Sequence, residues 1–239
     1  MNIAVVGTGT MGSLLASRIE NTEDLTLTAL VGHLSKGGEV FKACDMLIDF
    51  SHPSNLEAIL EYGIKTNTPL VIGTTGFDDS DLELIREASE TIPILFTRNT
   101  SLGINVLSEI LMRFSSVLEE FDIEVIEKHH NQKLDAPSGT AKMLVDSIKS
   151  GLGQTYETVN GREGMKKRST KEIGVHAIRG GTIVGEHTVL YAGNDEIIEL
   201  KHTSLSKEVY VTGALKAARF LIENEKGLYS MKDVIDLRR

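Results

Sequence analysis

The sequence has little cysteine, a minority of basic residues and no long apolar run. Its 239 residues include a single cysteine, Cys44, which excludes an internal disulfide framework and is typical of a reducing cytoplasm. Aspartate and glutamate number 34 against 25 lysines and arginines, and an acidic chain is a poor candidate for binding nucleic acid. No apolar run approaches the roughly 18 residues of a membrane span, and the chain starts on a predicted strand rather than a signal peptide. We therefore expect a cytoplasmic protein with neither a nucleic-acid nor a membrane partner.

The first hundred residues alternate between short apolar runs and segments with helical spacing. Helical stripes such as Met11–Ile19 separate the runs, and Ser80 with Glu83 fits a capping box before a further helix. This alternation is typical of a Rossmann-like, doubly wound parallel sheet. The runs that we interpret as buried strands are Ile3–Val6, Leu25–Val31, Met46–Phe50, Leu70–Gly73 and Ile94–Thr97.

The pattern changes in the second half of the chain. Apolar spacing predicts a long helix over Val106–Leu118, a strand from Phe121 and a helix that begins near Ser138. We expect a loop or lid over Gly151–Lys171. Strands with a turn at Ala192–Asp195 follow, which predicts a second α+β domain with a mixed or antiparallel sheet. The expected strands are Val175–Arg179, Glu186–Tyr191 and Ile197–His202, and a last helix, Leu215–Ile222, returns to the first domain.

A glycine-rich loop follows the first predicted strand. Its spacing is Gly-x-Gly-x-x-Gly: Gly7 permits a tight turn, Gly9 lets the backbone approach a pyrophosphate, and Gly12 lets the helix pack on the strand. The start of the helix offers free N–H groups to phosphates. We expect the whole loop (Gly7, Thr8, Gly9, Thr10, Met11 and Gly12) to bind a dinucleotide. The alternative is a tight strand–helix turn without a ligand.

The acidic residue that commonly ends the second strand and binds the ribose of NAD is absent. Val31 ends this strand, and Gly32 and His33 follow it. His33 and Lys36 are instead placed to face a 2′-phosphate, which favours NADP. If both side chains are solvated, the protein uses either cofactor, so we expect NADPH, NADH or both.

The stretch Glu127–Ala141 gathers polar chemistry that a hydrophobic core does not need. His129 and His130 can donate a proton near neutral pH, and Lys133 is a point charge suited to a carboxylate. Ser138 fits a helix N-cap, and Gly139 and Thr140 fall in the first turn, where N–H groups hold anions. Together they predict a pocket for a small anion that must be protonated. The carboxylates of the stretch lack ligand spacing with the histidines, so we predict no metal site.

The same stretch resembles the signature of the 4-hydroxy-tetrahydrodipicolinate reductase (dihydrodipicolinate reductase) family. The family pattern Glu-x-His-His-x-x-Lys-x-Asp-Ala-Pro-Ser-Gly-Thr-Ala is matched from Glu127 to Ala141. The resemblance extends along the chain, through Gly7–Gly12, Asp49–Ser51, Gly73–Gly76, Asn99, Arg179–Gly181, Ile183–His187 and Gly227–Val234.

The resemblance implies roles for individual residues. It implies His129 as proton donor, Lys133 as a second catalytic group, and His130 with Ser138, Gly139 and Thr140 at the carboxylates of a cyclic dicarboxylate substrate. The family forms homotetramers. Val31 replaces the family's usual acid, and Arg98 and Thr100 stand where smaller or aromatic residues are common. The implied contacts to the nicotinamide half of the cofactor are Gly73, Thr74, Thr75, Arg98, Asn99, Thr100 and Ser101.

We therefore expect an NAD(P)H-dependent oxidoreductase that reduces 4-hydroxy-tetrahydrodipicolinate in lysine and diaminopimelate biosynthesis. Residues 1–101 and 208–239 would form the dinucleotide-binding domain, and residues 102–207 the substrate-binding and oligomerisation domain. Two alternatives remain at this point. One is another two-domain NAD(P)-dependent dehydrogenase of an amino or hydroxy acid, and the other is a non-catalytic nucleotide-binding regulator.

Overall fold

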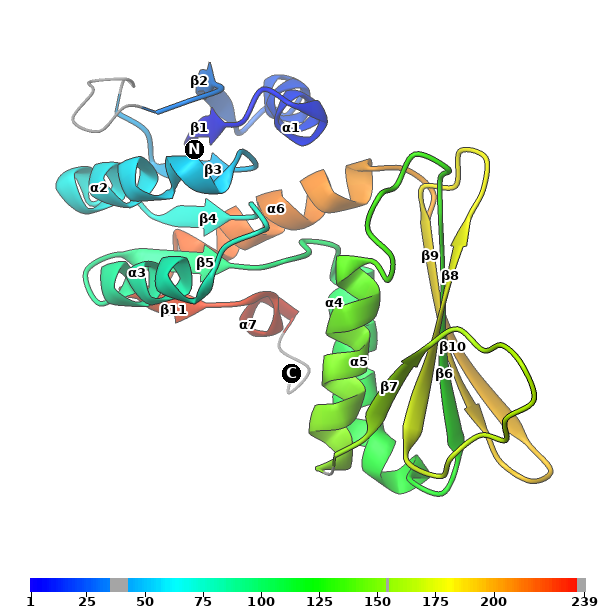
Figure 1. Ribbon diagram of the computed structural model, residues 1–239. Helices are drawn as coiled ribbons and strands as arrows, with labels where there is room; N and C mark the ends of the chain where they lie inside the picture. Colours follow the sequence, from blue (N-terminus) through cyan, green and yellow to red (C-terminus); the bar gives the residue numbers. More distant parts are fainter. Residues whose placement is uncertain (35–42, 154, 236–239) are drawn as a thin grey trace. The chain divides into compact units, whose positions relative to one another are not determined.

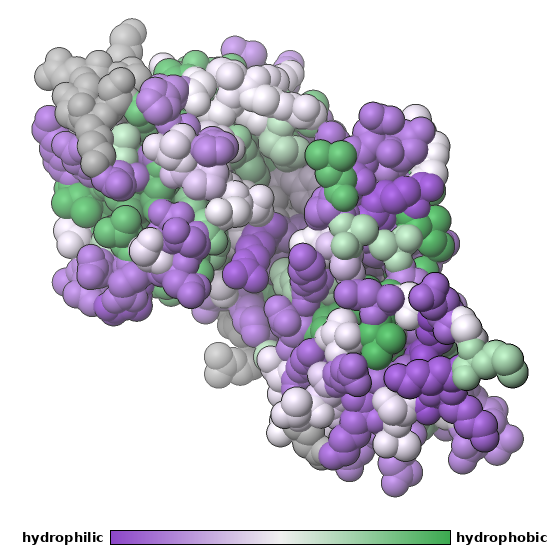
Figure 2. Space-filling model, in the orientation of Figure 1, coloured by the Kyte–Doolittle hydropathy of each residue, from purple (hydrophilic) through white to green (hydrophobic). Residues whose placement is uncertain are grey.

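The computed structural model describes residues 1–34, 43–153 and 155–235. The chain divides into two compact units: unit 1 contains Met1–Leu102 and Glu208–Arg239, and unit 2 contains Gly103–Lys207. Within the described residues, none of the helices has both the length and the apolar character needed to cross a membrane. On the face seen in Figure 2, apolar side chains are scattered among polar ones.

Unit 1 is built on a six-stranded sheet in the order β11-β5-β4-β3-β1-β2, and every pair of neighbours is parallel. The order reverses between β1 and β3, which makes their carboxyl ends a topological switch point. The predicted strands of the first hundred residues are all present. The bounds are β1 Asn2–Val6, β2 Thr26–Val31, β3 Met46–Asp49, β4 Leu70–Ile72, β5 Pro93–Phe96 and β11 Gly227–Tyr229.

Helices cover both faces of this sheet (Figure 1). On one face lie α1 (Thr10–Glu20), α6 (Glu208–Leu221) and the short α7 (Met231–Ile235). On the other lie α2 (Leu56–Thr66), which follows a 3-10 turn, and α3 (Asp79–Ser89). The interior strands β1, β3, β4 and β5 are largely buried, which explains why they lack polar alternation, whereas the edge strands β2 and β11 are partly exposed.

The capping box predicted from Ser80 and Glu83 is wrong. The helix starts earlier, because the carboxylate of Asp78 accepts the Asp81 N–H at 2.9 Å and the Asp81 carboxylate accepts the Asp78 N–H at 3.1 Å. Ser80 Oγ only donates to Asp78 Oδ1, at 2.6 Å, and Glu83 pairs with Arg86. Two carboxylates, two residues earlier in the chain, therefore take the N-cap and N3 roles that were expected of Ser80 and Glu83.

Unit 2 contains a five-stranded mixed sheet in the order β10-β9-β6-β8-β7. The central strand β6 is parallel to β8 and antiparallel to β9, so the predicted mixed sheet is confirmed. The helices α4 (Leu102–Phe114) and α5 (Gly139–Leu152) pack on one face through the cluster that contains Leu111, Leu144 and Val189. The strands are β6 Asp122–His129, β7 Glu157–Asn160, β8 Glu172–Arg179, β9 Gly185–Ala192 and β10 Ile197–Ser204.

Two details of unit 2 correct the sequence interpretation. The stretch expected to be a loop contains the end of α5 and the strand β7, whose four largely exposed residues gave no apolar run. The helix predicted over Val106–Leu118 is α-helical only as far as Phe114 and continues as a 3-10 helix over Ser115–Leu118. Ser115 Oγ donates to Leu111 O at 2.6 Å at this change. The expected turn between β9 and β10 is confirmed, and in it Gly193 N donates to Glu196 O at 2.9 Å.

Candidate active site

The glycine loop of unit 1 combines tight packing with one open position. Gly7 has φ +116°, and a Cβ there would lie 2.1 Å from Phe50 O. A Cβ on Gly12 would lie 1.7 Å from Gly7 O, whereas one on Gly9 would meet nothing within 4 Å. Gly9 is the N-cap of α1 and supplies no side-chain cap, so the first-turn N–H groups from Thr10 and Met11 remain available. The loop therefore fits the pyrophosphate of a dinucleotide.

The loop after β2, where the cofactor preference was expected to lie, is held by a residue that the sequence did not single out. Asn55 Oδ1 accepts the Leu34 N–H at 3.2 Å, and Asn55 Nδ2 donates to Gly32 O at 3.3 Å. These contacts bracket His33, whose own side chain is exposed. Lys36 lies outside the described residues. The structure thus places His33 on a fixed backbone after β2 with an exposed imidazole.

A buried carboxylate lies where β3 ends, close to the expected cofactor contacts. Asp49 is 1% exposed; its Oδ1 accepts from Ser51 Oγ at 2.5 Å and from Ser51 N at 3.0 Å, while Oδ2 has no hydrogen-bond partner. Burial raises the pKa of Asp49 to about 6, against the opposing effect of these hydrogen bonds. Thr74, predicted to contact the cofactor, accepts the Ser51 N–H at 2.7 Å. Its neighbour Thr75 is exposed, and a Cβ on Gly73 would lie 2.4 Å from the Phe50 ring.

In the loop after β5, residues 98–101, side chains hydrogen bond to nearby backbone. Asn99 Oδ1 accepts the Ser101 N–H at 2.8 Å, and Thr100 Oγ1 donates to Tyr210 O at 2.8 Å. Arg98 is exposed, and Ser101 is buried. Helix α6 packs so closely here that a Cβ on Gly213 would lie 1.7 Å from Thr100 O. The backbone of this loop is therefore rigidly placed at the carboxyl end of β5.

The predicted proton donor of unit 2 sits at the end of the central strand. Along β6, Ile123, Val125, Glu127 and His129 alternate onto the buried face of the sheet. His129 Nδ1 lies 2.6 Å from Glu127 Oε2, and Glu127 is 0% exposed. A carboxylate can only accept, so Nδ1 carries the proton and Nε2 is left for other partners.

Arg179 of β8 neutralises this buried carboxylate. Its two terminal nitrogens donate to the two oxygens of Glu127 at 2.7 and 2.8 Å, and the Ser138 N–H donates to Glu127 Oε1 at 3.0 Å. Burial raises the pKa of Glu127, but the hydrogen bonds from Arg179 and His129 outweigh it and bring the pKa below its ordinary value. Burial lowers the pKa of His129, and Glu127 offsets part of that effect.

Lys133, predicted as the second catalytic group, lies in the turn that follows β6. Lys133 N donates to His130 O at 3.2 Å, and its Nζ forms an ion pair with Asp135 Oδ1 at 2.7 Å. Burial raises the pKa of Asp135 and the Lys133 charge lowers it, with the lowering dominant. The ammonium group is therefore tethered while about a quarter of the side chain, 23%, stays exposed. His130 is half-buried beside it.

The helix start predicted at Ser138 is confirmed. Ser138 is the N-cap of α5, and its Oγ accepts the Ala141 N–H at 3.1 Å. The same Oγ lies 3.2 Å from His187 Nε2, so the hydroxyl proton can be donated to that ring. A Cβ on Gly139 would meet nothing within 4 Å, and the Gly139 N–H donates to the carboxylate of Asp135. Gly139 and Thr140 are thus in the positions that suit an anion.

His187 of β9 is the third histidine of this region. Its ring packs edge-on against His129 with centroids 5.1 Å apart, and it is 3% exposed. Burial, helped by the nearby His129, lowers the pKa of His187 to about 3, so the ring is neutral at physiological pH. Sequence reasoning missed the contributions of Glu127, Arg179 and His187. The available signal was the two-residue spacing of Glu127 and His129, which puts both side chains on one face of a strand.

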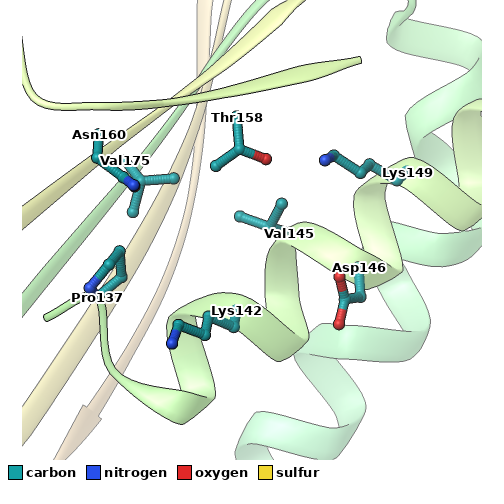
Figure 3. A pocket seen from close by; sticks show the side chains of 8 residues that line it. All are labelled: Pro137, Lys142, Val145, Asp146, Lys149, Thr158, Asn160 and Val175. Carbon is teal, nitrogen blue, oxygen red and sulfur yellow. The ribbon is translucent and has the colours of Figure 1, made fainter. Parts of the chain in front are cut away.

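A hollow of about 150 Å³ lies beside α5, the edge strand β7 and its neighbour β8 (Figure 3). Its lining includes Lys142 and Lys149 with apolar Val145 and Val175, and it contains none of the predicted catalytic residues. Among the described residues, no group of three or more histidine, cysteine, aspartate or glutamate side chains is placed to hold a metal ion.

Comparisons with known proteins cover both units. The family model described as dihydrodipicolinate reductase, N-terminus, matches residues 1–100, and the corresponding C-terminus model matches residues 103–235. A 4-hydroxy-tetrahydrodipicolinate reductase of Brachyspira hyodysenteriae is 45% identical over 98% of this chain and 100% of its own length. The enzyme of that name from Exiguobacterium sibiricum is 47% identical, covering 97% and 95%.

A solved structure shares the fold. It is that of a dipicolinate-bound dihydrodipicolinate reductase from Paenisporosarcina sp. TG-14, with a TM-score of 0.74 and 24% identity over 98% of this chain and 99% of that one. The fold prediction is therefore confirmed. Because the family models together match nearly the whole chain and the relatives match it end to end, the chain belongs to the dihydrodipicolinate reductase family.

Proposed function

We propose that this chain catalyses the NAD(P)H-dependent reduction of 4-hydroxy-tetrahydrodipicolinate, via dihydrodipicolinate, to tetrahydrodipicolinate in lysine and diaminopimelate biosynthesis. The curated relatives carry the corresponding enzyme name over nearly the full length of the chain. The observation that carries the assignment to residues is the end of β6, where Glu127 holds His129 near the charge of Lys133 and the turn leads into α5.

Each residue of this region has a chemical role. NAD(P)H, when bound, supplies a hydride to the conjugated imine of the substrate. The enamine that results must gain a proton, and His129 delivers it from Nε2, since Nδ1 is engaged by Glu127. Lys133 attracts the dianionic substrate and assists protonation. His130, Ser138 and the N–H groups of Gly139 and Thr140 bind its carboxylates.

The dinucleotide binds to unit 1 in this proposal, and the substrate to unit 2. The Gly7–Gly12 loop takes the pyrophosphate, and Gly73, Thr74, Thr75 and the 98–101 loop line the nicotinamide half. His33 and Lys36 select the ribose end. Lys36→Ala should then weaken NADPH more than NADH, which steady-state kinetics with each cofactor would test. Equal effects on the two cofactors would show that the side chain is solvated.

We further propose that the chain forms a cytoplasmic homotetramer through the sheet face of unit 2 that α4 and α5 leave uncovered. Lys128 and Lys201 bracket Glu186 on this face at 2.5 and 2.8 Å. Apolar Ile178 and Ile197 point to the same side, with exposed fractions of 44% and 65%. Sedimentation of the purified chain would test this assembly, and a monomer at micromolar concentration would contradict it.

An assay of cofactor oxidation tests the proposed reaction. The cyclic substrate is supplied, and the loss of nicotinamide absorbance is followed with NADH and with NADPH. Turnover with the cyclic dicarboxylate is expected. Oxidation of an amino or hydroxy acid instead would favour a different dehydrogenase, and cofactor binding without turnover of any of these compounds would favour a regulator.

A further inference from the structure

Glu127 is a charged group that the fold places at an energetic disadvantage. A buried carboxylate costs several kcal/mol unless charges and hydrogen bonds compensate for its lost hydration. At Glu127 this compensation involves the bidentate Arg179, the Ser138 N–H and His129 Nδ1. Arg179 is fixed in turn, because its Nη2 also donates to Asp135 O at 2.6 Å. The arrangement links β6, β8, the turn after β6 and the start of α5.

From this geometry we propose that Glu127 and Arg179 act as a positioning pair for the proton donor: Glu127 holds His129 with its Nδ1 protonated and its Nε2 directed at the substrate, and Arg179 fixes the position of that carboxylate. The inference deepens the proposed function and rests on it. Glu127 and Arg179 act through His129 in this scheme, and neither is assigned a contact with the reacting atoms.

The strand opposite His129 supports the orientation. The last pair between β6 and β9 is Lys128 with Glu186; Gly185 is the next residue of β9 beyond this pair, and a Cβ on it would lie 3.2 Å from His129 Nε2. The absence of a side chain there leaves the Nε2 edge uncrowded, while the Nδ1 edge is occupied by Glu127. One ring nitrogen is thus fixed, and the other is left accessible.

The charges around His129 come from several elements, and they act in different directions. Burial lowers the pKa of His129, Lys133 and Arg179 lower it further, and Glu127 is the group that raises it. His187, on β9, is neutral because its own pKa is lowered to about 3 by burial. Removing Glu127 therefore makes His129 harder to protonate, whereas removing Arg179 makes it easier, although both changes break the same bidentate contact.

This opposition supplies the test. The variants Glu127→Gln and Arg179→Gln are compared with wild type in pH profiles of kcat and kcat/KM. In Glu127→Gln we expect kcat to fall by roughly 10–100-fold, in the range for loss of an orienting partner, with the limb that requires protonated His129 displaced to lower pH. In Arg179→Gln that limb should move to higher pH, with a smaller loss of kcat. If this limb moves in the same direction in both variants, or moves in neither, the proposal is overturned.

A matched control and a direct measurement accompany the kinetics. Glu172→Gln removes another arginine-paired carboxylate of the same sheet, bonded to Arg162, and it should leave the limb where it is. In wild type, nitrogen NMR of the neutral His129 ring should show the proton on Nδ1. A proton on Nε2 would contradict the proposal even if Glu127→Gln fails to fold. Wild-type turnover without the opposed shifts refutes only the positioning pair, whereas absence of turnover refutes the proposed function.

Discussion

The two candidate binding regions of the molecule differ in the groups that form them: backbone N–H groups in unit 1 and charged side chains in unit 2. In the glycine loop of unit 1, the start of α1 carries no side-chain cap, and a Cβ on Gly9 would meet nothing within 4 Å. At the end of β6 in unit 2, side chains satisfy one another: Glu127 is bonded to His129, Arg179 and the Ser138 backbone. Binding at the first region depends on glycines, which have no Cβ atoms to obstruct a ligand. Binding at the second region depends on which side chains are ionised.

This difference predicts how each region fails. Backbone N–H groups do not titrate, so binding at the glycine loop should respond to steric changes and little to pH through the protein's own groups. The side-chain region contains groups with shifted pKa values, so it should respond to pH and to substitutions that preserve volume.

The largest effect should come from His129→Gln. Glutamine keeps the polarity and approximate volume of the ring but cannot deliver a proton at neutral pH. We expect kcat to fall by roughly 10²–10⁴-fold with a modest change in substrate KM, the pattern of an interaction made mainly in the transition state. Steady-state kinetics at saturating cofactor would measure it. A near-normal kcat with chemistry rate-limiting would leave His129 with a role in carboxylate binding alone.

The glycine loop offers a matched pair of variants. Gly9→Val places its side chain in open space and should raise the cofactor KM by on the order of a hundredfold, about 3 kcal/mol, while the fold survives. Gly12→Ala places a Cβ 1.7 Å from Gly7 O and should lower the melting temperature as well. Cofactor titration and thermal unfolding separate the two outcomes. Unchanged cofactor affinity in folded Gly9→Val would remove the dinucleotide from this loop.

Asp49 gives unit 1 its own pH-sensitive group and thereby sharpens the comparison. The pKa of its buried carboxyl is raised from 3.8 to about 6, so the native state binds that proton more tightly than the unfolded chain does. The stabilisation is fully present below pH 4 and is lost as pH rises through about 6, by roughly 1–3 kcal/mol. Asp49→Asn should lack this loss and become more stable relative to wild type at pH 7.5 than at pH 4. Denaturant unfolding measures the difference, and a constant offset between the two pH values would argue against it.

Ser138→Ala should have the smallest effect. The hydroxyl caps α5 and faces His187, whereas the Ser138 N–H that bonds Glu127 remains in the variant. We expect a loss of about 1 kcal/mol of unfolding free energy and a modest rise in substrate KM, because the N–H groups of Gly139 and Thr140 persist. A fall in kcat comparable with that of His129→Gln would show that the hydroxyl takes part in the chemistry.

The sequence predicted what depends on neighbours in the chain. The strands β1 to β5, the glycine turn and the cap at Ser138 each leave a local pattern, and the family, the fold class and the reductase function are confirmed. The partner of Glu127 could not be found in this way, because Arg179 lies 52 residues away and meets it only through the register of β6 and β8. The edge strand β7 was missed because its exposed residues need no apolar pattern. The roles of the site residues remain predictions.

The core of unit 1 is completed only when α6 and α7, near the end of the chain, have been synthesised. Unit 1 begins at the first residue, yet one side of its core is completed by Val211, Ala214, Ala218, Leu221 and Met231, which pack with Ile3, Val5 and Ile48. A ribosome adding about 5–20 residues per second delivers these side chains many seconds after β1 has emerged. Unit 2 is continuous in sequence and is available as a whole before α6 exists. During translation, one apolar face of the unit 1 sheet therefore stays uncovered until α6 is made. Chaperones can bind such a face at that stage.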